Sequence, residues 1–301
     1  MNLKVIDRLN QTGPLRPKRR SRTGTSPQVG AFTFVDLVVT VALLALVAVM
    51  ILPALGRAGT NAPAAQCLNN LRQLGASWAM YSSDSRGQLI ECHPWAMSPF
   101  GSRIAGVANP YSWAPGYAGS GTLSSYGPLP LHSSTNPIGL SKTVFYKYYN
   151  NVELLKCASD KRMVNGTEGY NPILRSYSMN NWMNGGIVGA GPRLFTKQEQ
   201  VFRPAATWVM IDEDAITLDD SYFVTFMDGR GFVNLPARRH NFGYTMNFAD
   251  GRAEIYKLRD AVTMSYNGPP PSGAGIAGSG NTADYRFHTN ITTYPINAWE
   301  N

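Results

Sequence analysis

The stretch that decides the fold is residues 239–258, RHNFGYTMNFADGRAEIYKL. Apolar and polar residues alternate in residues 244–248 and again in residues 253–257, and Asp250-Gly251 lies between the two runs. An Asp-Gly pair flanked by alternating residues is the strongest short-range signal for a β-hairpin. The stretch therefore predicts two antiparallel strands that turn at Asp250 and Gly251.

His240 stands just before this hairpin, with nine residues between it and Asp250. A strand of ten residues spans roughly 30 Å, so His240 and Asp250 are too far apart to act as a catalytic or metal-binding pair. We expect His240 to enter the strand and to make a hydrogen bond or a packing contact. A ligand-binding role with some other partner is the alternative.

Three further strands are predicted on the N-terminal side of the hairpin. Residues 175–183 (RSYSMNNWM), 206–213 (ATWVMIDE) and 221–227 (SYFVTFM) are rich in the apolar and aromatic residues typical of strands. The 29 glycines and 20 prolines predict many turns, and residues 83–150 show little periodicity. We expect a loop-rich α+β head over residues 83–301, built on an antiparallel β-sheet.

An amphipathic helix is predicted ahead of the head, over residues 56–82. Its apolar residues recur at steps of three and four, the spacing of a stripe that packs on the rest of a domain. Gly56, Gly59 and Pro63 predict a kinked or melted joint at its start. The stripe consists of Ala64, Cys67, Leu68, Leu71, Leu74, Trp78 and Tyr81.

The most apolar part of the chain is residues 34–52, FVDLVVTVALLALVAVMIL, in which Asp36 and Thr40 are the polar residues. About 20 apolar residues suffice to cross a bilayer as a helix. Residues 1–31 hold seven basic residues and one acid, which by the positive-inside rule keeps them in the cytoplasm. We therefore predict a basic leader over residues 1–31, a membrane-spanning helix over residues 32–55, and a head outside the cytoplasm.

Other interpretations of this segment stay open. A cleaved secretory signal has an apolar core of ~7–15 residues, shorter than this run, although residues 62–65 offer small residues for cleavage. A plain signal anchor and a buried core helix are two further alternatives. Arg19-Arg20 suggests a twin-arginine signal, but the apolar pair expected after the two arginines is missing.

Only +2 of the net charge of +8 belongs to residues 32–301, so a nucleic-acid surface is not supported.

Residues 31–36, AFTFVD, resemble the cleavage site of type IV prepilins. In that family a prepilin peptidase cuts before the Phe and methylates the new amine, which implies cleavage between Ala31 and Phe32. Asp36 and Pro53 stand at the family's places for an acid and a helix proline, and the resemblance implies that Asp36 sets the register between subunits. Ala31 replaces the usual Gly and Asp36 the usual Glu.

Asp36 is functional on physical grounds as well, because an ionisable side chain within an apolar span is costly. The alternative is that it lies at a headgroup boundary and has no role.

Further segments resemble a bacterial group of prepilin-like proteins with an N-terminal cleavage and methylation segment and a C-terminal H-x9-DG motif. These are residues 67–75 (CLNNLRQLG), 151–160 (NVELLKCASD) and 175–183, and His240 with Asp250-Gly251 matches the motif itself. The resemblance implies a pilin-like fold, in which a long membrane-spanning N-terminal helix packs on an antiparallel head.

The implied function is structural. The chain would be a pilin or pseudopilin subunit of a pilus or a type II secretion-like pseudopilus, located in the bacterial inner membrane as a single-pass protein. Its partners would be the prepilin peptidase and like subunits. The alternatives are a membrane-anchored extracytoplasmic binding protein that does not polymerise and, third, an anchored hydrolase. We expect no enzyme, since the sequence has no nucleophile elbow, phosphate loop, Cys-x-x-Cys pair or HExxH helix.

Two further sites are candidates. Five acids lie within nine residues, and clustered oxygen ligands suit Ca²⁺, although the spacing is not that of an EF-hand and a solvated acidic loop is the alternative. The three cysteines, Cys67, Cys92 and Cys157, are too few for a disulfide scaffold, and we predict one disulfide between Cys67 and Cys157. The five acids are Asp212, Glu213, Asp214, Asp219 and Asp220.

Overall fold

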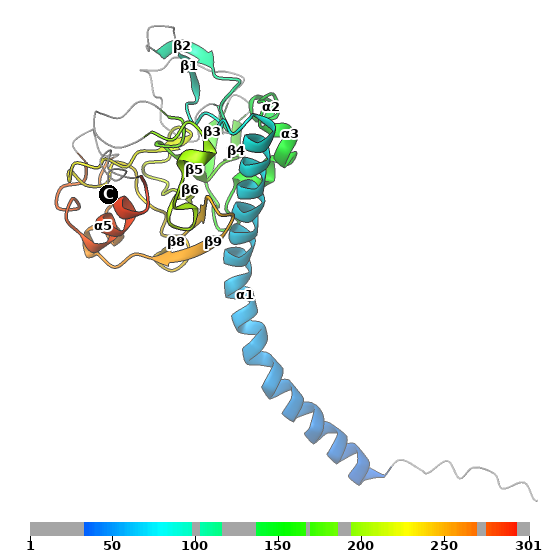
Figure 1. Cartoon of the computed structure of the whole chain (residues 1–301). Coiled ribbons are helices and arrows are strands. Elements are labelled where there is room, and N and C mark those ends of the chain that lie inside the picture. The colour runs from blue at the N-terminus through cyan, green and yellow to red at the C-terminus, as the bar shows by residue number, and fades with distance from the viewer. Residues whose placement is uncertain are drawn as a thin grey trace, which may run out of the picture. The chain divides into compact units, whose positions relative to one another are not determined.

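The computed structural model describes residues 33–97, 103–115, 137–166, 169–185, 194–269 and 275–293 (Figure 1). The chain divides into two compact units, Met1–Ala54 and Leu55–Asn301. The predicted leader and the predicted processing residues, Ala31 and Phe32, lie outside the described residues.

The longest element is α1, a helix of 51 residues over Phe34–Asp84. It continues through Gly56, Gly59 and Pro63, so the alternative of a melted joint is wrong, while the predicted kink stays a prediction. A proline removes one backbone hydrogen bond of a helix. The good helix formers Ala62, Ala64 and Ala65 flank it, and the packing of the helix from Cys67 onward outweighs this loss.

The predicted membrane-spanning helix is corrected by the structure. Within the described part of the chain, no helix is both long enough and apolar enough to cross a membrane. The predicted span over residues 32–55 and the predicted single-pass location in the inner membrane are therefore wrong.

A five-stranded sheet forms the centre of the second unit, in the order β7-β5-β6-β8-β9. Three of its pairings are antiparallel, but β5 and β7 are parallel. The α+β class is confirmed, while the sheet is mixed rather than antiparallel throughout. The strands are β5 (Tyr177–Asn180), β6 (Trp208–Asp212), β7 (Tyr222–Phe223), β8 (Gly243–Phe248) and β9 (Ala253–Lys257).

The predicted hairpin is confirmed as β8 and β9. Tyr244 pairs with Tyr256, and the N–H of Phe248 donates to the carbonyl of Arg252 at 2.8 Å. Gly251 has a φ of +87°, a conformation that glycine adopts without strain, so the Asp-Gly pair supplies the turn chemistry that its sequence predicts.

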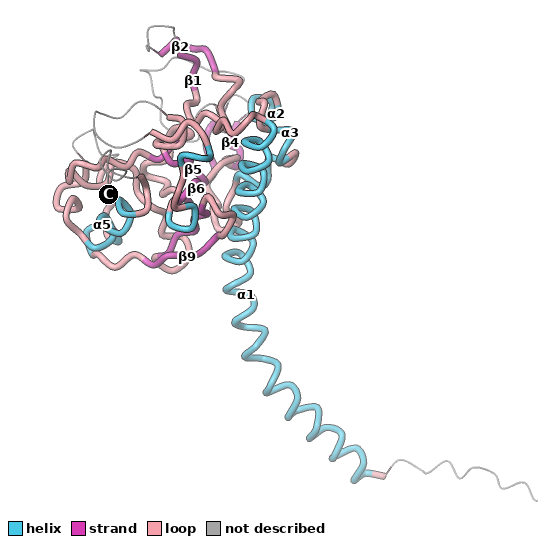
Figure 2. Tube along the Cα trace, viewed as in Figure 1, coloured by secondary structure: helices cyan, strands magenta, loops and turns pink. Residues whose placement is uncertain are grey.

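Both faces of the sheet are covered, and Figure 2 shows the strands between α1 and the segment that carries α5 (Ala283–Asn290). On one face, the predicted helical stripe packs against the sheet: Leu71, Leu74 and Trp78 share a core with residues of β5 and β6. On the other face, aromatic residues of β6 and β8 pack with Tyr285 of α5. All six residues of β8 are buried as a result.

One side chain fixes the distance between α1 and the sheet. The amide of Asn247, in β8, donates to the carbonyl of Leu71 at 2.8 Å and accepts from the N–H of Met210 at 2.8 Å. Gly75 of α1 faces this amide, and a Cβ at Gly75 would lie 2.9 Å from its nitrogen. The absence of a side chain at Gly75 therefore lets the helix approach the strand closely.

Short elements and loops make up the rest of the described head (Figure 2). Two small hairpins lie outside the main sheet, and the remaining helical elements have at most five residues. The hairpins are β1 (Trp95–Met97) with β2 (Arg103–Ala108) and β3 (Met163–Gly166) with β4 (Gly169–Pro172). The helical elements are α2 (Pro137–Ser141), α3 (Tyr146–Tyr149), η1 (Val152–Leu155), η2 (Gln198–Gln200), η3 (Pro204–Ala206) and α4 (Ala261–Met264).

Candidate functional site

Two cysteines and one histidine meet in the core between α1 and the sheet. The ligand-type atoms of Cys67, Cys157 and His240 all lie within 4.8 Å of one another, and all three residues are buried. The Cys157 sulfur is 3.3 Å from Nε2 of His240. The structure thus joins the predicted disulfide pair to the motif histidine, which the sequence analysis treated separately.

Each of the three side chains is held by its own element. Cys67 lies on the buried stripe of α1, and Cys157 follows η1, where Asn70 of α1 donates to the carbonyl of Lys156 at 3.0 Å. The N–H of Ala158 donates to the Cys67 sulfur at 3.1 Å. These bonds fix the loop after η1 against the helix.

His240 lies in the turn that leads into β8, as expected for a strand-entry residue. Its N–H donates to the carbonyl of Gly243 at 3.2 Å, and the next two residues, Asn241 and Phe242, have positive φ values of 54° and 53°. The ammonium of Lys257 donates to the carbonyls of His240 and Asn241. This tight turn places the imidazole against the two thiols.

A carboxylate completes the group. Asp212, at the end of β6, is fully buried, and its Oδ2 lies 3.8 Å from Nε2 of His240. Within the described part of the chain, this oxygen has no hydrogen-bond partner. The other oxygen, Oδ1, accepts from the Arg239 guanidinium at 2.7 Å. In the sequence, Asp212 stands among the acids of the predicted calcium site, and no local pattern indicates that it lies beside His240.

The arrangement does not match a nucleophile relay. In a Cys-His-Asp relay, the thiol and the carboxylate contact opposite nitrogens of the imidazole. Here Cys157 and Asp212 both approach the same nitrogen, Nε2 of His240. The Cys157 sulfur and the Asp212 carboxylate thus lie on the same side of the imidazole, so the relay geometry is not present.

The two thiols differ in their electrostatics. The neighbouring Cys157 side chain lowers the pKa of Cys67, whereas the neighbouring Cys67 and burial raise the pKa of Cys157. Burial raises the pKa of Asp212 to about 7, although the nearby Arg239 acts in the opposite direction.

Arg239 connects this group to a second buried carboxylate, Asp160. Its guanidinium donates to Asp160 at 3.0 Å and twice to the carbonyl of Glu213. Asp160 also accepts from Arg162 and from the hydroxyl of Ser176. Burial alone would raise the pKa of Asp160, but these donors outweigh it and lower that pKa.

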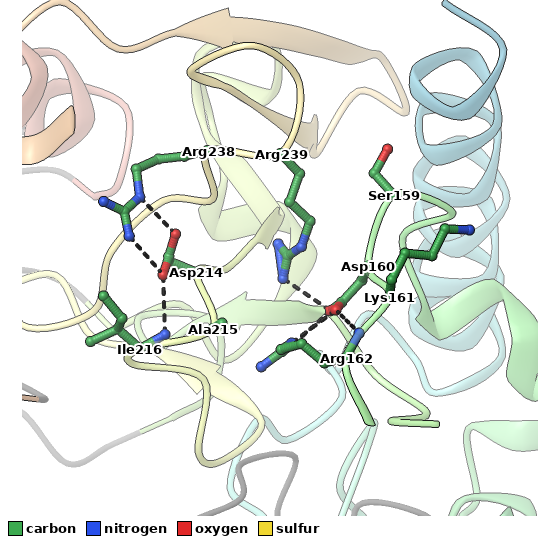
Figure 3. Close-up of a pocket in the computed structure, with 9 residues that line it drawn as sticks. All are labelled: Ser159, Asp160, Lys161, Arg162, Asp214, Ala215, Ile216, Arg238 and Arg239. Atoms are coloured by element: carbon green, nitrogen blue, oxygen red, sulfur yellow. Dashed lines mark hydrogen bonds and ion pairs between the residues drawn. The ribbon is translucent and has the colours of Figure 1, made fainter. Parts of the chain in front are cut away.

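A pocket of about 540 Å³ opens on the outer side of Arg239. Figure 3 shows that its guanidinium groups point toward carboxylates: Arg238 toward Asp214, and Arg239 and Arg162 toward Asp160. The three guanidinium groups are thus engaged by the protein's own acids. The lining residues are Ser159, Asp160, Lys161, Arg162, Asp214, Ala215, Ile216, Arg238 and Arg239.

The structure does not bring the five acids of the predicted calcium site together. Asp212 and Asp214 pair with two different arginines, Arg239 and Arg238. Glu213 accepts from Asn234 and Thr217, and its burial raises its pKa to about 8. Asp219 and Asp220 accept from backbone N–H groups of their own loop. In the described part of the chain, only Cys67, Cys157 and His240 converge as a set of three metal-ligand residues.

All three cysteines are free thiols in the structure. Cys92 is buried elsewhere in the core, with its sulfur 4.0 Å from the carbonyl of Asn181, and burial raises the pKa of its thiol. Cys67 and Cys157 are close enough for one ligand to contact both. The disulfide between them stays a prediction.

A second candidate site is the start of α1, residues 33–49. Asp36 accepts from both the N–H and the hydroxyl of Thr33, and the N–H of Asp36 donates to that hydroxyl. This is a capping box, and the hydrogen bonds from Thr33 lower the pKa of Asp36. The spacing Thr-x-x-Asp before an apolar run was the available signal. Pro53 lies within α1, but its side chain is outside the described residues.

Comparisons with models of protein families, with curated proteins and with solved structures find no match to this chain. The resemblance to prepilin-like proteins therefore rests on the sequence motifs alone and stays a prediction.

Proposed function

We propose that the chain is a structural subunit that assembles with copies of itself through residues 34–49 of α1. The observation that carries this proposal is the exposure of large apolar side chains along that segment, such as Phe34 at 79%, Leu44 at 69% and Val49 at 70%. Eleven such residues lie in the segment. Successive residues turn by ~100° around a helix, so they cover its whole circumference.

A helix that is apolar all round is stable in water only when other apolar surfaces cover it. One flat partner surface leaves part of the circumference exposed, whereas a bundle of identical helices surrounds each member. Copies of this chain carry the same apolar surface. We therefore take a second copy of residues 34–49 as the partner.

The polar side chains described in this segment are suited to burial in such a bundle. The Asp36 carboxylate is bonded to Thr33, and the hydroxyl of Thr40 donates to the carbonyl of Leu37 at 2.8 Å. Because these groups have partners within their own helix, an apolar surrounding costs them less than it would cost unpaired groups.

Processing by a prepilin peptidase fits the position at which the helix begins. Cleavage before Phe32 would remove the basic leader and leave Thr33, the capping residue of α1, as the second residue of the mature chain. The product would be a pilin-like or pseudopilin-like subunit, in which Asp36 helps to set the register between neighbouring helices.

Charge substitutions in the helix test the assembly. We expect chemical cross-linking to trap complexes of the chain with itself, and Leu43→Glu with Leu46→Glu to abolish them, because buried carboxylates are strongly unfavourable in a helix bundle. The control is Gln73→Glu, which places a carboxylate at an exposed position of the same helix. Equal cross-linking of the double variant and the native chain would contradict assembly through this helix, and the absence of self-complexes from both would favour a binding protein that does not polymerise.

A further inference from the structure

We propose that Cys67, Cys157, His240 and Asp212 form a closed site for a zinc ion, which ties α1 to the sheet. The donor set is two sulfurs, one imidazole nitrogen and one carboxylate oxygen. Cysteine, histidine and aspartate are the ligands that Zn²⁺ takes in proteins, and four of them complete its tetrahedron.

The distances suit a tetrahedral ion. With metal–ligand bonds of ~2.0–2.3 Å, the ligand atoms of a zinc tetrahedron lie roughly 3.3–3.8 Å apart. Nε2 of His240 lies 3.3 Å from the Cys157 sulfur and 3.8 Å from Oδ2 of Asp212. The two sulfurs and Nε2 all lie within 4.8 Å of one another, so a small contraction brings them onto one ion.

The unsatisfied oxygen of Asp212 is an independent indication of a ligand. A buried carboxylate oxygen without a hydrogen bond is costly, and this one lies 3.8 Å from Nε2 of His240 with no hydrogen-bond partner in the described part of the chain. Arg239 holds the other oxygen of the same carboxylate and so fixes its orientation. A bound cation would give Oδ2 the partner that it lacks.

The surroundings supply the outer contacts of a metal site. The N–H of Ala158 already donates to the Cys67 sulfur, as backbone amides do to metal-bound thiolates, and Arg239 orients the carboxylate. With both thiols ionised, the four ligands carry three negative charges. The zinc ion and the guanidinium of Arg239 balance them.

The site would be structural rather than catalytic. Its four protein ligands leave no open position for water, and all four residues are buried. The ion would join the helix, the loop after η1, the end of β6 and the turn before β8, so that its binding free energy adds to the stability of the head.

Metal analysis of the full chain, produced with added Zn²⁺ under reducing conditions, tests this proposal. We expect about one zinc per chain, and a fall in the unfolding temperature when a strong chelator removes it. Replacement by Co²⁺ should give the near-ultraviolet absorption of thiolate-to-cobalt charge transfer and the visible bands of a tetrahedral ion.

Matched variants separate a specific site from adventitious binding. Cys157→Ser and His240→Gln should lose the stoichiometric metal, and Asp212→Asn should weaken binding while the charge-transfer absorption remains. Cys92→Ser, which removes the third buried thiol, should bind as the native chain does. A native chain without zinc, or with a Cys67–Cys157 disulfide found by mass spectrometry under these conditions, would overturn the proposal. So would a Co²⁺ complex without charge-transfer absorption, a readout that does not depend on any variant folding.

Discussion

His288 shows how a single buried residue carries a pH-dependent cost. It is fully buried among Trp208, Phe223 and Phe232, and neither of its ring nitrogens has a hydrogen-bond partner in the described part of the chain. Burial lowers its pKa from 6.5 to about 3. The folded protein therefore holds this imidazole neutral at pH values where the unfolded chain protonates it.

The sign of the effect follows from these two pKa values. Above about pH 6.5, His288 is neutral in both states and does not lower the free energy of unfolding. As the pH falls from there toward about 3, that free energy decreases by at most ~1.4 kcal/mol per pH unit, because the unfolded chain binds a proton that the folded chain does not. His288→Phe keeps an aromatic ring in place and removes both unpaired nitrogens. We expect this variant to be more stable than the native chain, and its free energy of unfolding in urea to fall less between pH 7 and pH 5. An equal fall in the variant and the native chain would contradict this role of His288.

At the scale of elements, the contact between α1 and β8 depends on the missing side chain of Gly75. Helix propensity alone predicts that Gly75→Ala stabilises the protein by ~0.5–1 kcal/mol. The new methyl group, however, would lie 2.9 Å from the amide nitrogen of Asn247, which is held by Leu71 and Met210. We expect this steric clash to outweigh the gain in helix propensity and to lower the free energy of unfolding by ~1–3 kcal/mol.

Denaturant unfolding measures this difference, and Gln73→Ala serves as the comparison because Gln73 is exposed on the same helix. The comparison variant should stay within about 0.5 kcal/mol of the native chain. If Gly75→Ala instead stabilises the chain, the helix and the strand do not approach as closely as described.

Elements with strong local signals could be predicted from the sequence. The hairpin follows from the Asp-Gly turn with its flanking alternation, and the buried stripe of α1 follows from spacings of three and four residues. The continuity of α1 through Pro63 could not be predicted, because packing far along the helix decides it. The parallel pairing of β5 with β7 also depends on tertiary contacts that leave no local pattern.

The same reasoning applies to the candidate site. Cys67, Cys157 and His240 each belong to a motif that the sequence analysis recognised, but their convergence depends on how α1, the loop after η1 and the hairpin pack together. Asp212 was grouped with its sequence neighbours, yet the end of β6 turns it toward His240 and away from the rest of the acidic loop. Spacing along the sequence alone does not predict these distances in space.

At the scale of the whole molecule, the head and residues 34–49 differ in how their apolar side chains are covered. The head buries apolar side chains in two cores, one on each side of the sheet. Residues 34–49 leave theirs exposed, and this difference is the reason why we propose the helix as the assembly surface.

The most direct test is the intact mass and N-terminal sequence of the chain recovered from cross-linked self-complexes. We expect complexes that contain only copies of this chain, each beginning at an N-methylated Phe32. Recovery of the chain as a monomer that still carries residues 1–31 would contradict it.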